Sequence, residues 1–134
     1  MRRKTVLLLM LLMSMCSLSA QKVTFNVKYS YEYDMQKYEY IRELGYAEGV
    51  IVKDGDTAVT LKGKQYKVVT KDRDVKTEKM KSVQYTAVDE FGAEHIICFN
   101  EEYTFPEELK YQVIIFNGNS PYDWTYYITD EGKQ

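Results

Sequence analysis

The sequence contains very few residues that form cross-links or bind metal ions. It has two cysteines and one histidine in 134 residues, and Cys16 lies in an apolar segment near the N-terminus. The other cysteine, Cys98, has no partner in the rest of the chain, so we expect no internal disulfide. Structural zinc sites draw most of their ligands from His and Cys. The composition therefore predicts no metal and no cofactor.

An excess of positive charge is also absent. The chain has 18 Lys and Arg against 20 Asp and Glu, a net charge of −2, and without residues 1–20 it would have 15 against 20, a net charge of −5. Proteins that bind nucleic acids depend on Lys and Arg contacts to phosphates. We therefore expect no nucleic-acid partner, and no attraction to an anionic membrane surface.

One long apolar run is present, and it lies at the N-terminus. The basic start "MRRK" precedes "TVLLLMLLM", and the small-residue stretch "SMCSLSA" follows it. The apolar run is too short to span a bilayer, and this order is typical of a secretory signal peptide. We expect cleavage after Ala20, which leaves residues 21–134 as a single β domain of an exported, periplasmic or extracellular protein.

Cys16 offers an alternative, because a cysteine after an apolar run is the lipidation site of bacterial lipoproteins. Met15 stands before it, where the processing enzyme prefers a small residue. We therefore favour removal of Cys16 with the signal peptide. If Cys16 is lipidated instead, the protein is an outer-membrane lipoprotein, and this is the only route by which we expect membrane association.

The rest of the chain is dominated by alternation of apolar and polar residues. Between residues 23 and 33 the odd positions are apolar or aromatic, which predicts a strand with one buried face. Further strands are expected at 49–53, 57–63, 65–70, 82–89, 94–100, 111–117 and 124–129. Turn residues separate several of them, such as Asp54-Gly55. The polar stretch 71–81 is interpreted as a solvated loop or a protruding hairpin tip, and the Pro106-containing stretch 101–108 as a loop.

About eight antiparallel strands with short sequential connections predict an all-β fold, most simply a meander closed into a small barrel or a partly open, lipocalin-like barrel. Two packed sheets are the alternative. The segment 35–44 is ambiguous: Asp34 and Gly45 are suitable caps for a short helix, whereas Tyr38, Tyr40 and Leu44 also fit a strand. We favour the short helix.

His95 and Cys98 lie close together in the sequence, and a thiolate beside an imidazole is a nucleophile pair. On a regular strand, however, residues 95 and 98 point to opposite faces. We therefore expect no catalytic residue, and we interpret Cys98 as a small buried apolar residue. A thiol-based enzyme or redox protein remains an alternative function.

Tyrosine is abundant, with 13 residues, and it combines an apolar ring with a polar tip that suits ligand sites. In a closed meander the first and last strands are neighbours, so tyrosines of 29–33 are expected to lie beside the aromatic residues of 124–126. The candidate ligand-binding residues are Tyr29, Tyr31, Tyr33, Trp124 and Tyr126. Their alternative role is ordinary packing of strand residues.

The stretches "LKGKQYKVV" and "AVDEFGAEHIICF" resemble parts of uncharacterised small exported bacterial all-β proteins, and the Ser19-Ala20-Gln21 junction resembles those of exported Bacteroidota-type proteins. The resemblance covers about half of residues 21–134 and carries no catalytic motif. Our preferred hypothesis is an exported, non-enzymatic domain that binds a small apolar or glycan-like ligand at a tyrosine-lined barrel mouth. The alternative is a structural or interaction module with a protein partner in the cell envelope.

Overall fold

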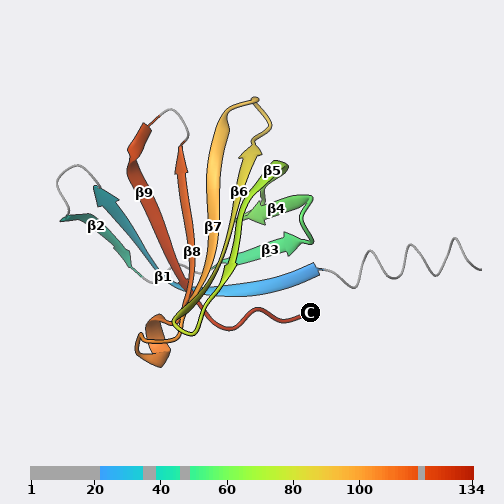
Figure 1. Ribbon diagram of the computed structural model, residues 1–134. Helices are drawn as coiled ribbons and strands as arrows, with labels where there is room; N and C mark the ends of the chain where they lie inside the picture. The colour runs from blue at the N-terminus through green and yellow to red at the C-terminus, as the bar shows by residue number, and fades with distance from the viewer. Residues whose placement is uncertain (1–21, 35–38, 46–48, 118–119) are drawn as a thin grey trace, which may run out of the picture.

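A computed structural model describes residues 22–34, 39–45, 49–117 and 120–134, and it shows an all-β protein (Figure 1). No helix among these residues is long and apolar enough to cross a membrane. A 3₁₀ turn, η1 (Glu107–Leu109), precedes β8. The strands are β1 (Lys22–Asp34), β2 (Glu39–Gly45), β3 (Val50–Asp54), β4 (Ala58–Leu61), β5 (Lys64–Lys76), β6 (Met80–Val88), β7 (Glu94–Glu102), β8 (Tyr111–Asn117) and β9 (Ser120–Thr129).

Eight of these strands close into an antiparallel barrel, which confirms the predicted fold class. From β3 to β9 each strand pairs with the next along the chain, and β1 pairs with both β3 and β9 to complete the ring. In the described part of the chain β2 pairs only with β1, outside the ring. The sequential pairing explains why short turns suffice, since antiparallel neighbours need only a hairpin connection.

The first strand changes direction in its middle, and Figure 1 shows its first half crossing one end of the barrel before the second half turns away. Lys22 to Asn26 pair with β3, whereas the residues from Val27 onward pair with β9. Val27 pairs with Thr129 and Ser30 with Tyr127, so β1 contains one extra residue here. An extra residue of this kind is a β-bulge, which bends a strand and shifts its alternation.

This bulge overturns the prediction that residues 23 to 33 present their odd positions to one face. Val27 belongs to the buried core, and Ser30, not Tyr29 or Tyr31, is the next buried residue of β1, at 1% exposed. Ser30 is on the same side as its partner Tyr127, which is also a core residue. Tyr29 and Tyr31 therefore lie on the outer face of the barrel.

The barrel interior is filled by branched aliphatic and aromatic side chains from all eight ring strands. Tyr85, Ile51 and Ile97 are among the largest residues that are fully buried. The core comprises Val27, Ile51, Val59, Leu61, Tyr66, Val83, Tyr85, Ala87, Ile97, Phe99, Val113, Ile115 and Tyr127. An apolar interior of this kind stabilises the fold through the removal of apolar surface from water.

One other local prediction was wrong. The favoured helix at 35–44 is replaced by strand β2 over residues 39–45, and residues 35–38 lie outside the described chain. Tertiary pairing with the second half of β1 decided between the two patterns. The polar stretch 71–81 is the end of a hairpin, the second of its two interpretations, in which β5 and β6 extend to a short turn at 77–79. The Asp54-Gly55 hairpin turn is confirmed, with Gly55 at φ 53°.

Candidate functional site

The two aromatic segments of the sequence are neighbours in the structure. Tyr31 pairs with Tyr126, and the backbone of Tyr33 pairs with that of Trp124, across the β1–β9 seam. On the next strand Phe116 stacks on Trp124, with ring centroids 4.5 Å apart and 7° between the ring planes. These residues form an outer aromatic surface, which we define as Tyr29, Tyr31, Phe116, Trp124 and Tyr126.

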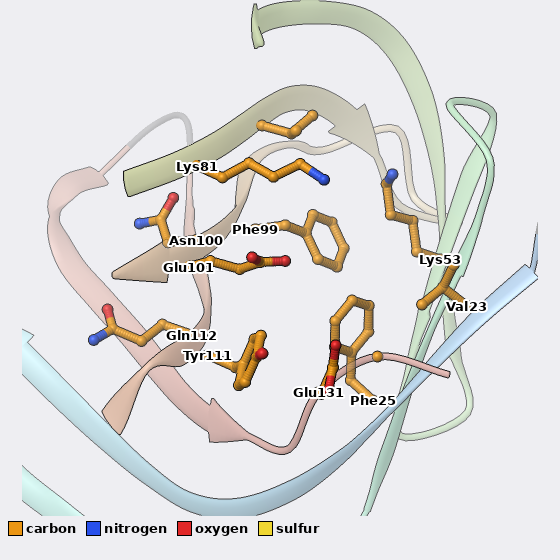
Figure 2. A pocket seen from close by; sticks show the side chains of 12 residues that line it. Val23, Phe25, Lys53, Lys81, Phe99, Asn100, Glu101, Tyr111, Gln112 and Glu131 are labelled. Atoms are coloured by element: carbon orange, nitrogen blue, oxygen red, sulfur yellow. The ribbon is translucent and has the colours of Figure 1, made fainter. Parts of the chain in front are cut away.

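A cavity of about 230 Å³ lies elsewhere, at the end of the barrel formed by the β3–β4 and β5–β6 turns, the β7–β8 loop and the C-terminal tail. We call this the pocket end. The pocket is lined by Val23, Phe25, Lys53, Lys81, Val83, Phe99, Asn100, Glu101, Tyr111, Gln112, Glu131 and Gly132 (Figure 2). Tyr29, Tyr31, Trp124 and Tyr126 do not line it, so their ligand-binding role stays a prediction for the outer surface.

The floor of the pocket is apolar and continuous with the core. Phe25 and Phe99 pack with ring centroids 5.5 Å apart, and Phe99 meets the ring of Tyr85 edge-on at 6.0 Å. Val83 is a buried core residue, whereas Val23 is half-buried. An apolar floor with a few charged groups around it is the usual composition of a small-molecule site.

The C-terminal tail forms one wall of the pocket. The backbone of Lys133 exchanges two hydrogen bonds with Thr24, of 2.7 and 2.9 Å. Asp130 accepts hydrogen bonds from the backbone and the side-chain amide of Asn26, at 2.9 and 2.8 Å. Gly132 lies directly on the floor, where an added Cβ would come within 2.5 Å of Phe25 and Val23. Only glycine allows the tail to approach this closely.

Several polar residues at the pocket rim already have partners. The side chain of Asn100 accepts a hydrogen bond of 2.7 Å from Ser82, and that of Gln112 donates one of 3.1 Å to the carbonyl of Leu109. Glu101 accepts a hydrogen bond of 3.3 Å from the hydroxyl of Tyr103. Lys53 and Lys81 differ, because neither forms an ion pair with any residue that the structure describes.

The opposite end of the barrel, which contains the β4–β5 and β6–β7 turns, has a second polar cluster that we call the turn end. Asp89 is its centre, with a side chain only 5% exposed. Its carboxylate accepts hydrogen bonds from the backbone of Phe91 and Ala93, at 2.9 and 3.0 Å, and from Nε2 of His95 at 2.9 Å. The hydrogen bond from His95 lowers the pKa of Asp89 to about 2.

His95 is therefore a structural residue of the turn end. A carboxylate can only accept, so Nε2 of His95 carries the proton. The imidazole also packs edge-on against Tyr66, with centroids 5.0 Å apart. Lys64 completes the cluster at 3.7 Å from Asp89. This arrangement anchors the β6–β7 turn, and it occupies Nε2 of His95 with the bond to Asp89.

Cys98 lies on the other face of β7, as the alternation of the strand predicted. Its thiol is buried and lies 3.4 Å from the side-chain oxygen of Gln84. Burial raises the pKa of Cys98 to about 11, so the thiol is protonated at neutral pH and is a weak nucleophile. Thiol and imidazole are not brought together, and among the described residues no group of acidic, His and Cys side chains is arranged to hold a metal ion.

Two of the pocket residues have a recognisable pattern in the sequence, a charged residue two positions after a core residue. Lys53 follows the core residue Ile51 by two positions on β3, and Glu101 follows Phe99 in the same way on β7. Each strand therefore has a charged residue at an inward-facing position, one residue before its end. That pattern marks the mouth of a barrel, but it identifies a pocket only when the strands that share the mouth are known.

No known protein family, curated protein or solved structure shows significant similarity to this chain.

Proposed function

We propose that this protein is an exported, non-enzymatic binding protein that takes a small ligand into the pocket at the pocket end of the barrel. The observation that carries the proposal is the cavity of about 230 Å³, in which an apolar floor meets two lysines that lack ion-pair partners in the described chain. Ligand pockets combine apolar walls with a few polar groups that fix orientation. The volume suits a ligand smaller than a drug-sized molecule.

Export rests on the N-terminal sequence. Removal of residues 1–20 as a signal peptide places the protein in the periplasm or outside the cell, and lipidation at Cys16 makes it an outer-membrane lipoprotein. Intact mass measurement of protein purified from cells that express the full chain separates the two. Loss of residues 1–20 supports the signal peptide, a diacylated N-terminal cysteine supports the lipoprotein, and a full-length cytoplasmic chain contradicts both.

Native mass spectrometry of the same purified protein tests ligand binding. We expect a co-purifying mass that is released on denaturation. Val83→Phe directs a ring into the pocket and should remove this mass, whereas the matched control Val75→Phe places the same ring on an exposed residue of β5, at 39% exposed, and should retain it. Circular dichroism confirms that each variant is folded.

Two results would contradict binding at the pocket. If Val83→Phe retains the mass and Tyr31→Ser loses it, the ligand binds to the outer aromatic surface instead. If neither a co-purifying mass nor binding of any added probe is detected, the binding function itself is wrong. Tyr31 is a suitable outer control because its side chain lies on the opposite face of β1 from the core.

A role as an interaction module of the cell envelope is the second candidate. The observation that favours it is β2, whose second edge has no strand partner in the described chain. A free edge can pair with a strand of another protein. Light scattering of the purified protein, together with pull-down from envelope extracts, tests this role. A monomer without envelope partners would contradict it.

A further inference from the structure

Lys53 is the most unusual charged residue of the pocket. Its side chain is half-buried, and the ammonium lies 5.6 Å from the ring centre of Tyr85 and 5.7 Å from that of Phe99. Burial lowers the pKa of Lys53, the carboxylate of Asp56 opposes this shift, and the positive charges of Lys71 and Lys81 add to it. Lys53 forms no direct ion pair with the described residues, and a partly buried ammonium without such a contact is unfavourable.

The nearest carboxylates are already engaged with other groups. Asp56 accepts a hydrogen bond of 2.6 Å from the hydroxyl of Tyr85 and lies 3.5 Å from Lys71. Asp74 pairs with the same lysine at 2.7 Å. Both carboxylates contact Lys71 directly, whereas Lys53 has no carboxylate within ion-pair distance among the described residues. A direct anionic contact to Lys53 is therefore left for a ligand to supply.

The pocket contains charges of both signs. Figure 2 shows the ammonium groups of Lys53 and Lys81 on the same side of the Phe99 ring, the carboxylate of Glu101 beside that ring, and the carboxylate of Glu131 at the ring of Phe25. All four residues line the cavity, yet no ion pair joins them among the described residues. The pocket therefore presents two ammonium groups and two carboxylates around an apolar floor.

We propose that the ligand is a small zwitterion of the amino-acid class, with its carboxylate bound by Lys53 and Lys81, its ammonium facing Glu101 and Glu131, and an apolar side chain on Phe25 and Phe99. This inference rests on the proposed binding function and specifies its ligand. Complementary charges of both signs provide specificity, and unpaired charges reject other ligands.

Other ligand classes fit this arrangement less well. An uncharged apolar molecule would cover Lys53 without a counter-charge and would increase its desolvation. A simple anion would pair with the lysines but would also be repelled by the two glutamates. A zwitterion satisfies the lysines and the glutamates in one molecule, and the cavity volume of about 230 Å³ favours a small one.

Titration of the ¹⁵N-labelled protein, processed as the cell exports it, tests the inference by NMR. The probes are L-phenylalanine, L-phenylalaninamide, N-acetyl-L-phenylalanine and benzyl alcohol, which have both charges, only the ammonium, only the carboxylate, and neither. We expect amide shifts at Val83 and Phe99 with L-phenylalanine, and dissociation constants weaker by about tenfold or more when either charge is removed.

Variants assign each charge to its residue. Lys53→Met retains the aliphatic stem and should remove the preference for L-phenylalanine over L-phenylalaninamide. Glu101→Gln should remove its preference over N-acetyl-L-phenylalanine. Lys76→Met is the matched control for the lysine change, because Lys76 is an exposed residue of β5 that does not line the pocket, and it should leave both preferences unchanged.

The outcomes separate this inference from the proposed function. If benzyl alcohol binds as tightly as L-phenylalanine at the pocket amides, the zwitterion is wrong while pocket binding stands. If N-acetyl-L-phenylalanine binds best, the ligand is a simple anion and the role of Glu101 is wrong. If no probe shifts any pocket amide and no mass co-purifies, both proposals are overturned.

Discussion

The two ends of the barrel contain similar residues and use them differently. At the turn end, the carboxylate of Asp89 has four partners within 3.7 Å, from His95, Lys64 and two backbone amides. At the pocket end, Lys53 lies over two rings and has no ion-pair partner in the described chain. Saturated polar groups stabilise a fold, whereas unsatisfied ones are available to a ligand.

The same contrast distinguishes His95 and Lys53, whose roles the sequence alone does not indicate. His95 is a candidate for chemistry from the sequence because it is the only histidine, yet in the structure its Nε2 bonds to Asp89 and its ring packs against Tyr66 at the turn end. Lys53 carries no distinctive signal in the sequence, because lysines near strand ends are common. The number of hydrogen-bond and ion-pair partners of a buried or half-buried charged group therefore distinguishes a structural residue from a candidate ligand-binding residue. This number is known only from the structure.

The largest effect is expected from Asp89→Ala at the turn end. This change removes the acceptor for two backbone amides and for His95, so the β6–β7 turn loses its anchor. Thermal unfolding followed by circular dichroism should show a clear fall in the midpoint at pH 7. Glu90→Ala, an exposed carboxylate in the same turn, is the matched control and should leave the midpoint nearly unchanged.

The contribution of Asp89 to stability should also depend on pH. The folded pKa of Asp89 is about 2, below its ordinary value of 3.8, so its contribution to stability is complete above about pH 4. It is lost as the pH falls from about 4 to about 2, because over this range the unfolded state binds the proton while the folded carboxylate stays ionised. The difference in midpoint between the native protein and Asp89→Ala should shrink over this range. A constant difference would contradict the role of the carboxylate charge.

The next largest effect is expected from Gly132→Ala at the pocket end. The new Cβ would approach Phe25 and Val23 to 2.5 Å, so the tail must move away from the pocket floor. Overpacking of this kind costs about 1–3 kcal/mol, measurable by urea unfolding. Hydrogen exchange at Thr24 and Lys133 should become faster. If Lys133→Ala, which keeps the backbone pairing, has the same effect, the steric explanation is wrong.

The smallest effect on stability is expected from Lys53→Met. Removal of a half-buried charge without a partner should change the free energy of unfolding by no more than about 0.5 kcal/mol, or increase it. A loss of unfolding free energy as large as that from Gly132→Ala would show that Lys53 stabilises the fold. This result would contradict the contrast between the turn end and the pocket end.

The lowered pKa of Lys53 also predicts a contribution of this residue to the pH dependence of the unfolding free energy at alkaline pH. Burial lowers its folded pKa below 10.5, so just below pH 10.5 the unfolded state binds more protons than the folded state. Lys53 therefore contributes an increase in the free energy of unfolding as the pH rises through this window, while the raised pKa values of Tyr85 and Tyr127 act in the opposite direction. The stability of the native protein relative to Lys53→Met should increase over this range, because only the native protein has the Lys53 contribution. Urea unfolding at a series of alkaline pH values measures it.

Much of the fold was predictable because each prediction depended on local alternation. Strands β6 and β7 form where strands were expected, over 82–89 and 94–100, and His95 and Cys98 lie on opposite faces of β7 as expected. The candidate site was not predictable in the same way. Lys53, Lys81 and Glu101 come from three strands that are separated by tens of residues, and nothing local indicates that they share one cavity.

Some local patterns were consistent with two structures, and long-range pairing selected one. Residues 39–45 carry spacing suited to a helix and to a strand, and the second half of β1 provided the partner that made them a strand. The tyrosine run was regular enough to predict a single face, but the bulge after Val27 moved Tyr29 and Tyr31 outward.

The alternation of side chains by itself determined that this protein is built from antiparallel strands, because a period of two suits a strand with one buried face. With Cys16 in the expected signal peptide, the single remaining cysteine predicted no internal disulfide. Only the tertiary structure decided which face of β1 is buried, since one extra residue reverses the alternation. Only the closure of the barrel decided where its unpaired charges meet, because the neighbours of a side chain across a barrel belong to distant parts of the chain.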